Sequence, residues 1–175
     1  MSKLQYHLER SQRLPVRRDE VFAFFADAGN LQEITPPFLS FRILSTMPVA
    51  MRPGAKIDYS LVLFGIRFRW RTRITYWQPG VCFVDEQESG PYALWRHTHH
   101  FADEGQGTLM KDTVEYTLPL GPLGRLARWL FVRRTLDRIF DYRRDVIARR
   151  FPATMPTSAR TASGPASHNV VWRES

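Results

Sequence analysis

Apolar and polar residues alternate over most of the first 118 positions, and this period of two predicts a series of β-strands. The clearest case is residues 67–74, where Phe68, Trp70, Thr72 and Ile74 alternate with four arginines. One face of this strand should be buried, and the other should present its arginines to solvent. We expect further strands at residues 6–14, around Phe41 and Ile43, and at 56–63, 81–87, 93–101 and 108–118.

Short turn sequences separate these segments and favour antiparallel pairing, which needs only a brief connection. Phe64-Gly65 predicts a tight hairpin, because glycine accepts the positive φ of such turns. Two short helices interrupt the strands near the amino end. The first runs from about Arg18 through Phe25, and the second covers residues 31–34 before Thr35-Pro36-Pro37, where proline ends it.

The spacing changes again after residue 122 and predicts one long amphipathic helix over residues 123–151. Its apolar stripe comprises Leu123, Leu126, Leu130, Val132, Leu136, Ile139, Phe140, Val146, Ile147 and Phe151. Its opposite face carries Arg125, Arg128, Arg133, Arg134, Arg138, Arg144, Arg149 and Arg150. Such a stripe needs a partner surface, and the sheet provides one. The expected fold is α+β: a curved antiparallel sheet of about seven strands under one long carboxy-terminal helix, with a cavity between them.

Length and composition fit one globular domain over residues 1–151. Residues 152–175 are rich in Thr, Ser, Ala, Pro and Gly, and we expect a disordered tail there, with docking of Val170-Val171-Trp172 less favoured. Cys82 is the only cysteine, which excludes an internal disulfide and fits a reducing compartment. With no signal-peptide pattern and no apolar run of about 18 residues, the sequence suggests a cytoplasmic protein.

The order of elements, together with several local motifs, resembles the START-like, or Bet v 1-like (SRPBCC), helix-grip superfamily. The motifs are the segment 21–25 followed by Asn30-Leu31, the run Ile34-Thr35-Pro36-Pro37, the hairpin from Asp85-Glu86-Gln87 to Gly90-Pro91-Tyr92, and Trp95-Arg96-His97-Thr98-His99. Within that superfamily the chain is most similar to bacterial polyketide cyclase/dehydrase-related ligand-binding domains. The resemblance implies the helix-grip fold, but its members range from lipid carriers to cyclases, so fold alone does not select a function. A single cysteine excludes the Rieske branch.

Strand parity predicts where polar groups could meet inside the sheet. The strand at 93–101 places Trp95, His97, His99 and Phe101 on one face. The inward faces of its neighbours carry Asp85 and Gln87 on one side and Asp112 on the other. Tyr59 and Trp70 would join from the earlier hairpin. The predicted ligand-binding set is therefore Tyr59, Trp70, Asp85, Gln87, Trp95, His97, His99, Phe101 and Asp112.

Three interpretations of this set stay open. It is a buried polar network in which carboxylates hold the histidines, a recognition set in a mostly apolar pocket, or an acid–base pair, with His97, His99, Asp85 and Asp112 as candidates. His-x-His could also converge on an ion, but so short a motif is weak evidence, and we predict neither a metal nor another cofactor.

The net charge of +8 and pI near 10.2 permit an anionic partner. Arg125, Arg128, Arg133 and Arg134 lie close to Trp129 and Phe131, a combination typical of a membrane-surface patch. Ion pairs along the helix, such as Asp141 with Arg144, offer the plainer interpretation. Arginines on opposite faces of the molecule argue against a nucleic-acid-binding groove.

The leading hypothesis is binding of a small hydrophobic or aromatic molecule. The alternatives are a cyclase or dehydratase-type lyase on a polyketide-like substrate, and a peripheral membrane or RNA partner.

Overall fold

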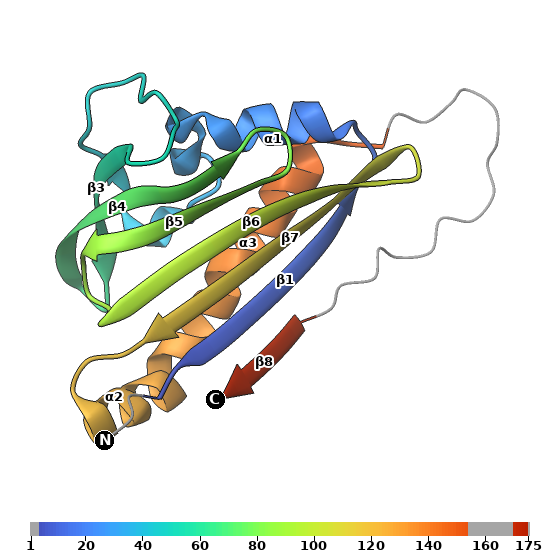
Figure 1. The fold of residues 1–175 in the computed structure, drawn as a ribbon. Coiled ribbons are helices and arrows are strands. Elements are labelled where there is room, and N and C mark those ends of the chain that lie inside the picture. Colours follow the sequence, from blue (N-terminus) through green and yellow to red (C-terminus); the bar gives the residue numbers. More distant parts are fainter. Residues whose placement is uncertain (1–3, 154–169, 175) are drawn as a thin grey trace.

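The computed structural model describes residues 4–153 and 170–174 of the 175-residue chain (Figure 1). Its regular elements, in chain order, are β1 (Tyr6–Leu14), α1 (Arg18–Ala26), η1 (Ala28–Gln32), η2 (Pro37–Leu39), β2 (Arg42–Ile43), β3 (Lys56–Leu63), β4 (Ile66–Gln78), β5 (Cys82–Ser89), β6 (Leu94–Glu104), β7 (Gly107–Thr117), α2 (Gly121–Ala127), η3 (Arg128–Val132), α3 (Arg133–Arg150) and β8 (Val170–Glu174).

The strands form one antiparallel sheet in the order β2-β3-β4-β5-β6-β7-β1-β8. Helix α3 crosses one face of this sheet, and α1 covers the same face near one end (Figure 1). The predicted helix-grip arrangement is therefore confirmed. Figure 1 also shows that the long strands β4 to β7 and β1 are twisted. Because twisted strands make a sheet curve, this sheet can bend around α3.

The strands predicted from alternation lie close to their expected positions, and β1 and β3 have the predicted bounds. In β4 the side chains of Trp70, Thr72 and Ile74 are buried, while the alternating arginines face solvent. The hairpin between β3 and β4 has φ of 53° at Phe64 and 78° at Gly65. Two successive positive φ values are what a two-residue hairpin loop with the twist of its strands requires.

The second short helix differs from the expectation. Instead of a helix at residues 31–34, the chain forms two 3₁₀ turns, η1 and η2. The Asp27 side chain accepts a hydrogen bond from Gly29 N–H, which caps η1 and starts it before the predicted position. Pro36 and Pro37 then prevent the turns from joining into one α-helix.

The long helix contains the largest departure from the prediction. It starts at Gly121 and runs through α2, the π-helical turn η3 and α3 to Arg150. In α3 the stripe is buried as expected, with Leu136, Phe140, Val146 and Ile147 on the sheet. Up to and within the π turn the orientation is reversed. Arg128, which begins that turn and was predicted outside, is 9% exposed, whereas Leu123 and Leu126, predicted inside, are 67% and 52% exposed.

The π turn explains this reversal. A π turn adds a residue to one turn of the helix, so the apolar positions before it and after it do not fall on one continuous face. The inward side of the first part carries Gly124, Arg128 and Val132. Gly124 lies so close to the preceding chain that an added Cβ would approach the carbonyl oxygen of Pro119 to 2.3 Å.

Within the described residues, no helix is both long enough and apolar enough to cross a bilayer.

The expected disordered tail, residues 152–175, falls mostly outside the described residues. Besides Pro152 and Ala153, the described part is β8, whose residues Val170–Glu174 pair with Arg10–Tyr6 of β1 in antiparallel register. The segment that we considered a less favoured docking strand therefore extends the sheet by one strand. The free edge of β1 offers unpaired backbone groups, and a Val-Val-Trp segment has the β-propensity to pair with them.

The reversed helix predicts unequal costs for one substitution. Leu136 is 2% exposed and Leu126 is 52% exposed, although both belong to the same apolar pattern. Leu136→Ala should lower the free energy of unfolding by about 2–5 kcal/mol, because it removes buried methyl groups and leaves a cavity. Leu126→Ala should change it by less than about 0.5 kcal/mol. Urea unfolding of the two variants checks this, and similar costs would contradict the observed orientation.

Candidate functional site

Four polar side chains meet at the middle of the sheet, on the face that α3 covers. His97 and His99 project from the same face of β6. In the strand register His97 lies opposite Asp85 of β5, and His99 lies opposite Asp112 of β7. The two-residue period of a strand thus brings both histidines between two carboxylates. The predicted convergence of these four residues is what the structure shows.

Both carboxylates interact with the histidines. Asp112 Oδ1 lies 3.0 Å from His97 Nε2 and 2.8 Å from His99 Nδ1. Asp85 Oδ2 lies 3.0 Å from His99 Nε2 and 3.8 Å from His97 Nδ1. Asp85 also accepts a hydrogen bond at Oδ1 from the Thr72 hydroxyl, at 3.2 Å. Three of the four side chains are almost fully buried, whereas the Asp85 side chain keeps 17% of its surface exposed.

The two rings have different surroundings. His99 has a carboxylate oxygen within 3.0 Å of each nitrogen, which favours its protonated, imidazolium form. His97 has a close carboxylate only at Nε2, 3.0 Å from Asp112, because the Asp85 oxygen is 3.8 Å from its Nδ1. This environment favours a neutral His97 ring that donates from Nε2 to Asp112.

The electrostatic environment supports this assignment. Burial and the neighbouring positive charge of His99 lower the pKa of His97 to about 4. Burial also disfavours charge on His99, but its hydrogen bonds to Asp112 and Asp85 outweigh that effect and raise its pKa. Burial opposes charge on Asp85 as well, yet the hydrogen bond from His99 and the positive charges of His99 and Arg143 hold its pKa below the usual value.

Arg143 of α3 completes the cluster and was not among the predicted residues. Its guanidinium Nη2 lies 3.8 Å from Asp112 Oδ1 and 3.3 Å from His99 Nδ1. Burial disfavours the Asp112 carboxylate, but the Arg143 charge and the two histidines hold its pKa well below the usual value. The sequence held a signal for this residue. Arg143 lies three and four residues from Phe140 and Ile147, so it interrupts the buried stripe of the helix.

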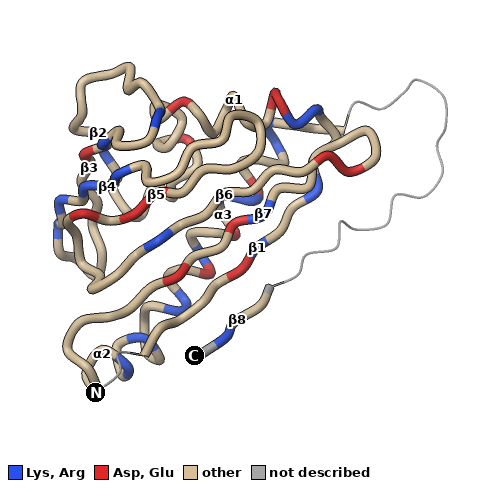
Figure 2. Tube along the Cα trace, in the orientation of Figure 1, with Lys and Arg blue, Asp and Glu red and all other residues tan. Residues whose placement is uncertain are grey.

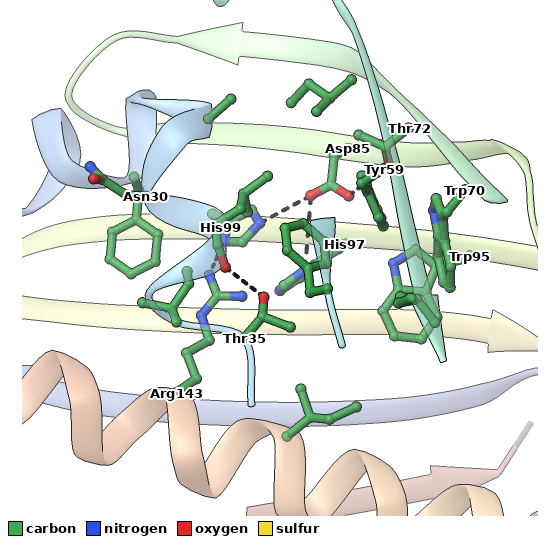
Figure 3. A pocket seen from close by; sticks show the side chains of 18 of the residues that line it. Asn30, Thr35, Tyr59, Trp70, Thr72, Asp85, Trp95, His97, His99 and Arg143 are labelled. Atoms are coloured by element: carbon green, nitrogen blue, oxygen red, sulfur yellow. Dashed lines mark hydrogen bonds and ion pairs between the residues drawn. The ribbon is translucent and has the colours of Figure 1, made fainter. Parts of the chain in front are cut away.

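A cavity of about 160 Å³ lies between α3 and the sheet, next to this cluster (Figure 3). Its polar lining includes Asp85, His97, His99, Arg143 and Thr72. The apolar walls come from Tyr59, Trp70, Trp95, Tyr92, Phe140 and Ile139, among others. An apolar cavity of roughly 150 Å³ can hold a benzene molecule, so this space suits at least one aromatic ring.

The structure separates the predicted ligand-binding set into three groups. Tyr59, Trp70, Asp85, Trp95, His97 and His99 line the cavity. Asp112 and Phe101 lie outside that lining: Asp112 is behind the histidines, and Phe101 packs with Phe22, Phe25 and Phe83 in the core under α1. Gln87 also lies apart, because its amide makes two hydrogen bonds to the Tyr92 backbone and closes the β5–β6 hairpin.

Comparison with known proteins identifies the family. The family model described as polyketide cyclase/dehydrase and lipid transport matches residues 14–141. The chain belongs to this family. Comparison with curated protein sequences finds no match.

Solved structures agree with the polyketide cyclase/dehydrase fold. The Zhui aromatase/cyclase of Streptomyces sp. R1128 is 15% identical with a TM-score of 0.66, over 83% of this chain and 93% of that one. The protein TTHA0849 of Thermus thermophilus is 20% identical with a TM-score of 0.61, over 83% and 96%. Major latex-like protein 151 of Panax ginseng is 13% identical with a TM-score of 0.59, over 85% and 99%. At such identities these likenesses show the fold alone, and they confirm the helix-grip expectation.

The cluster has some features of a metal site. Asp85, His97 and His99 each offer a ligand atom within 4.8 Å of the others. However, His99 Nε2, the atom facing Asp85, is held in a hydrogen bond to that carboxylate, and the Arg143 guanidinium adds a positive charge beside the ring. A divalent ion would have to displace the His99 proton next to this charge. The donor set therefore fits hydrogen-bonded protons better than a resident cation.

The depressed pKa of His97 predicts a loss of stability in mild acid. The unfolded chain binds a proton at His97 near pH 6.5, but the folded protein resists it until about pH 4. Stability from this residue is therefore complete above pH 6.5 and falls as the pH drops toward 4. At about 1.4 kcal/mol per pKa unit, the loss is on the order of 2–4 kcal/mol.

Urea unfolding at a series of pH values measures this effect. His97→Gln should flatten the dependence between pH 6.5 and 4, because the titrating ring is gone. His100→Gln is the matched control, since His100 lies on the same strand with its side chain exposed. If the free energy of unfolding of His97→Gln fell as steeply between pH 6.5 and 4 as that of the wild type, groups other than His97 would cause the loss of stability.

Proposed function

We propose that this polyketide cyclase/dehydrase family protein binds a small, largely apolar or aromatic molecule in the cavity between α3 and the sheet. The supporting observation is the composition of that lining, in which aromatic walls surround one compact polar cluster. Pockets that bind small molecules typically combine an apolar surface with a few placed polar groups. The sheet and the helix already hold this space open, so binding requires no large rearrangement.

Two buried donors indicate the chemistry of the guest. Trp70 Nε1 and Arg143 Nε have no hydrogen-bond partner among the described residues, and both residues line the cavity. A buried donor without an acceptor costs free energy. A ligand that carries carbonyl or hydroxyl oxygens could supply acceptors, so the proposed class is oxygenated aromatic or polyketide-like compounds.

Filling the cavity should weaken ligand binding. Ile139 of α3 lines the space and is partly buried, so Ile139→Trp would place a bulky ring where the ligand lies. We expect its affinity for a hydroxylated two-ring aromatic probe to fall at least about tenfold, equivalent to about 1.4 kcal/mol. Isothermal titration calorimetry measures the loss. Ala148→Trp, on the exposed side of the same helix, is the control and should keep the wild-type affinity.

Native mass spectrometry of protein purified from cells gives an independent test. A small molecule retained by the wild type and lost in Ile139→Trp would support the proposal. If neither the purified protein nor the probe titration showed binding, the cavity would not be a ligand site.

The second candidate function is acid–base catalysis, and the opposed protonation states of the histidines favour it. The pKa of His97 is lowered by burial and by the charge of His99, whereas the hydrogen bonds of His99 to Asp112 and Asp85 raise the pKa of His99, and both rings line the cavity. Environments that shift the pKa values of two titratable groups in opposite directions are typical of a site that contains a general base and a general acid. Proton removal next to a carbonyl, followed by loss of water, would suit cyclisation or dehydration of a poly-β-keto substrate, with His97 as base.

This candidate predicts a separation of turnover from binding. His97→Ala should abolish turnover of a poly-β-keto thioester while ligand affinity stays within about tenfold, because only the transition state loses an interaction. Product formation followed by mass spectrometry, with calorimetry alongside, makes the comparison. His100→Ala is the control. If affinity and turnover fell together in His97→Ala, the residue would have a binding role only.

A further inference from the structure

The start of the long helix places large apolar side chains in solvent. We define the outer patch as Leu120, Leu123, Leu126, Trp129 and Phe131, together with Phe64 at the tip of the β3–β4 hairpin. All six are exposed, and Leu120 and Trp129 are exposed to 74% and 75%. The two parts form one surface, because the ring centres of Phe64 and Phe131 lie 5.7 Å apart. Contiguous apolar surface of this kind marks an interaction site.

The outward position of these residues follows from how the helix packs. Arg128 occupies the inward position, where its guanidinium lies 4.1 Å from the Tyr6 ring centre and its Nε donates to the Tyr116 hydroxyl at 3.3 Å. Gly124, also on the inward side, fits closely against Pro119. The inward face is therefore occupied by an arginine and a glycine, and the leucines and Trp129 cannot turn inward without displacing them.

The two stretches of chain that carry the outer patch contain arginines and no acidic residue. There is no acidic residue between Glu115 and Asp137, nor between Asp58 and Asp85. Those two stretches, which contain the helix start and the hairpin, carry Arg125, Arg133 and Arg134 from the first and Arg67 and Arg69 from the second. Figure 2 shows the resulting blue segments around α2 and along β4. An apolar surface with Trp, Phe and Leu, bordered by arginines, complements an anionic lipid headgroup layer over an apolar interior.

We propose that the outer patch docks this protein on the surface of an anionic membrane, with Trp129, Leu123 and Phe64 entering the headgroup region. The inference does not depend on a ligand in the cavity. It does place that cavity near lipid, because Leu63, which precedes Phe64, belongs to the cavity lining.

Vesicle flotation with the full-length protein tests the proposal. The vesicles are phosphatidylcholine alone, or phosphatidylcholine mixed with phosphatidylglycerol. We expect binding to the mixed vesicles at physiological salt, weakening as salt is raised, and little binding to phosphatidylcholine alone. Absence of binding to the mixed vesicles would overturn the proposal.

Substitutions in the outer patch separate docking from bulk charge. Trp129→Ser should lower partitioning about tenfold or more, the effect of losing one large buried apolar side chain. Arg125→Glu and Arg134→Glu should each lower it about fivefold or more. The matched controls are Tyr76→Ser, an exposed aromatic elsewhere on β4, and Arg149→Glu at the far end of α3. Both should bind as the wild type does, and thermal melts should be unchanged in all five variants.

Equal binding by Trp129→Ser and Tyr76→Ser would overturn the role of the patch. Two other occupants would do the same. One is a second copy of the chain, seen as a dimer in sedimentation that Trp129→Ser converts to monomer without any vesicle binding. The other is RNA, seen as salt-resistant RNA retention by a protein that does not float.

Discussion

The central constraint on this structure is the sharing of two histidines between the carboxylates of Asp85 and Asp112. Asp112 contacts both rings, at 3.0 Å and 2.8 Å, while Asp85 holds His99 from the other side. Ionised groups in an apolar interior are costly unless each has a partner. Here Asp85 and Asp112 balance His99 and Arg143, so the cluster is neutral as a whole. This balance allows a polar group of this size to lie under α3.

The helix that carries Arg143 performs two different tasks along its length. In α3 the buried stripe of Leu136, Phe140 and Ile147 fixes the helix on the sheet, and Arg143 lies within that stripe. Before the π turn the same chain presents its apolar residues outward. A single uninterrupted α-helix with this sequence could not do both, because its period would put Trp129 and Leu136, seven residues apart, near the same side. The π turn therefore separates the part that covers the cavity from the part that faces outward.

Sequence reasoning could predict the site wherever one rule governs side-chain direction. Strand parity placed His97, His99, Asp85 and Asp112 correctly, because a strand has a strict two-residue period and its neighbours keep register. It failed for Gln87, which lies beside the hairpin and bonds to the Tyr92 backbone. Helical spacing failed to predict the inward direction of Arg128, since a π turn leaves no clear mark in the sequence. The start of η1 depended on its Asp27 cap, and the pairing of β8 depended on the free edge of β1. Hydrophobic spacing contains no information about either feature.

The charge balance also limits which guests the cavity can hold at rest. With Asp85, Asp112, His99 and Arg143 already neutralised, an anionic guest would add an unpaired charge to a buried space, whereas a neutral guest with carbonyl or hydroxyl oxygens would not. An anion could be accommodated only if a proton entered with it. His97 is the group able to accept that proton, because its Nδ1 lies 3.8 Å from an Asp85 oxygen that would stabilise the resulting imidazolium. A neutral guest that becomes an enolate by giving its proton to His97 enters without a charge, and the proton that balances the enolate stays in the site. The same cluster is thus compatible with simple binding of a neutral compound and with proton abstraction from it, and the position of a C–H bond relative to Nδ1 decides between them.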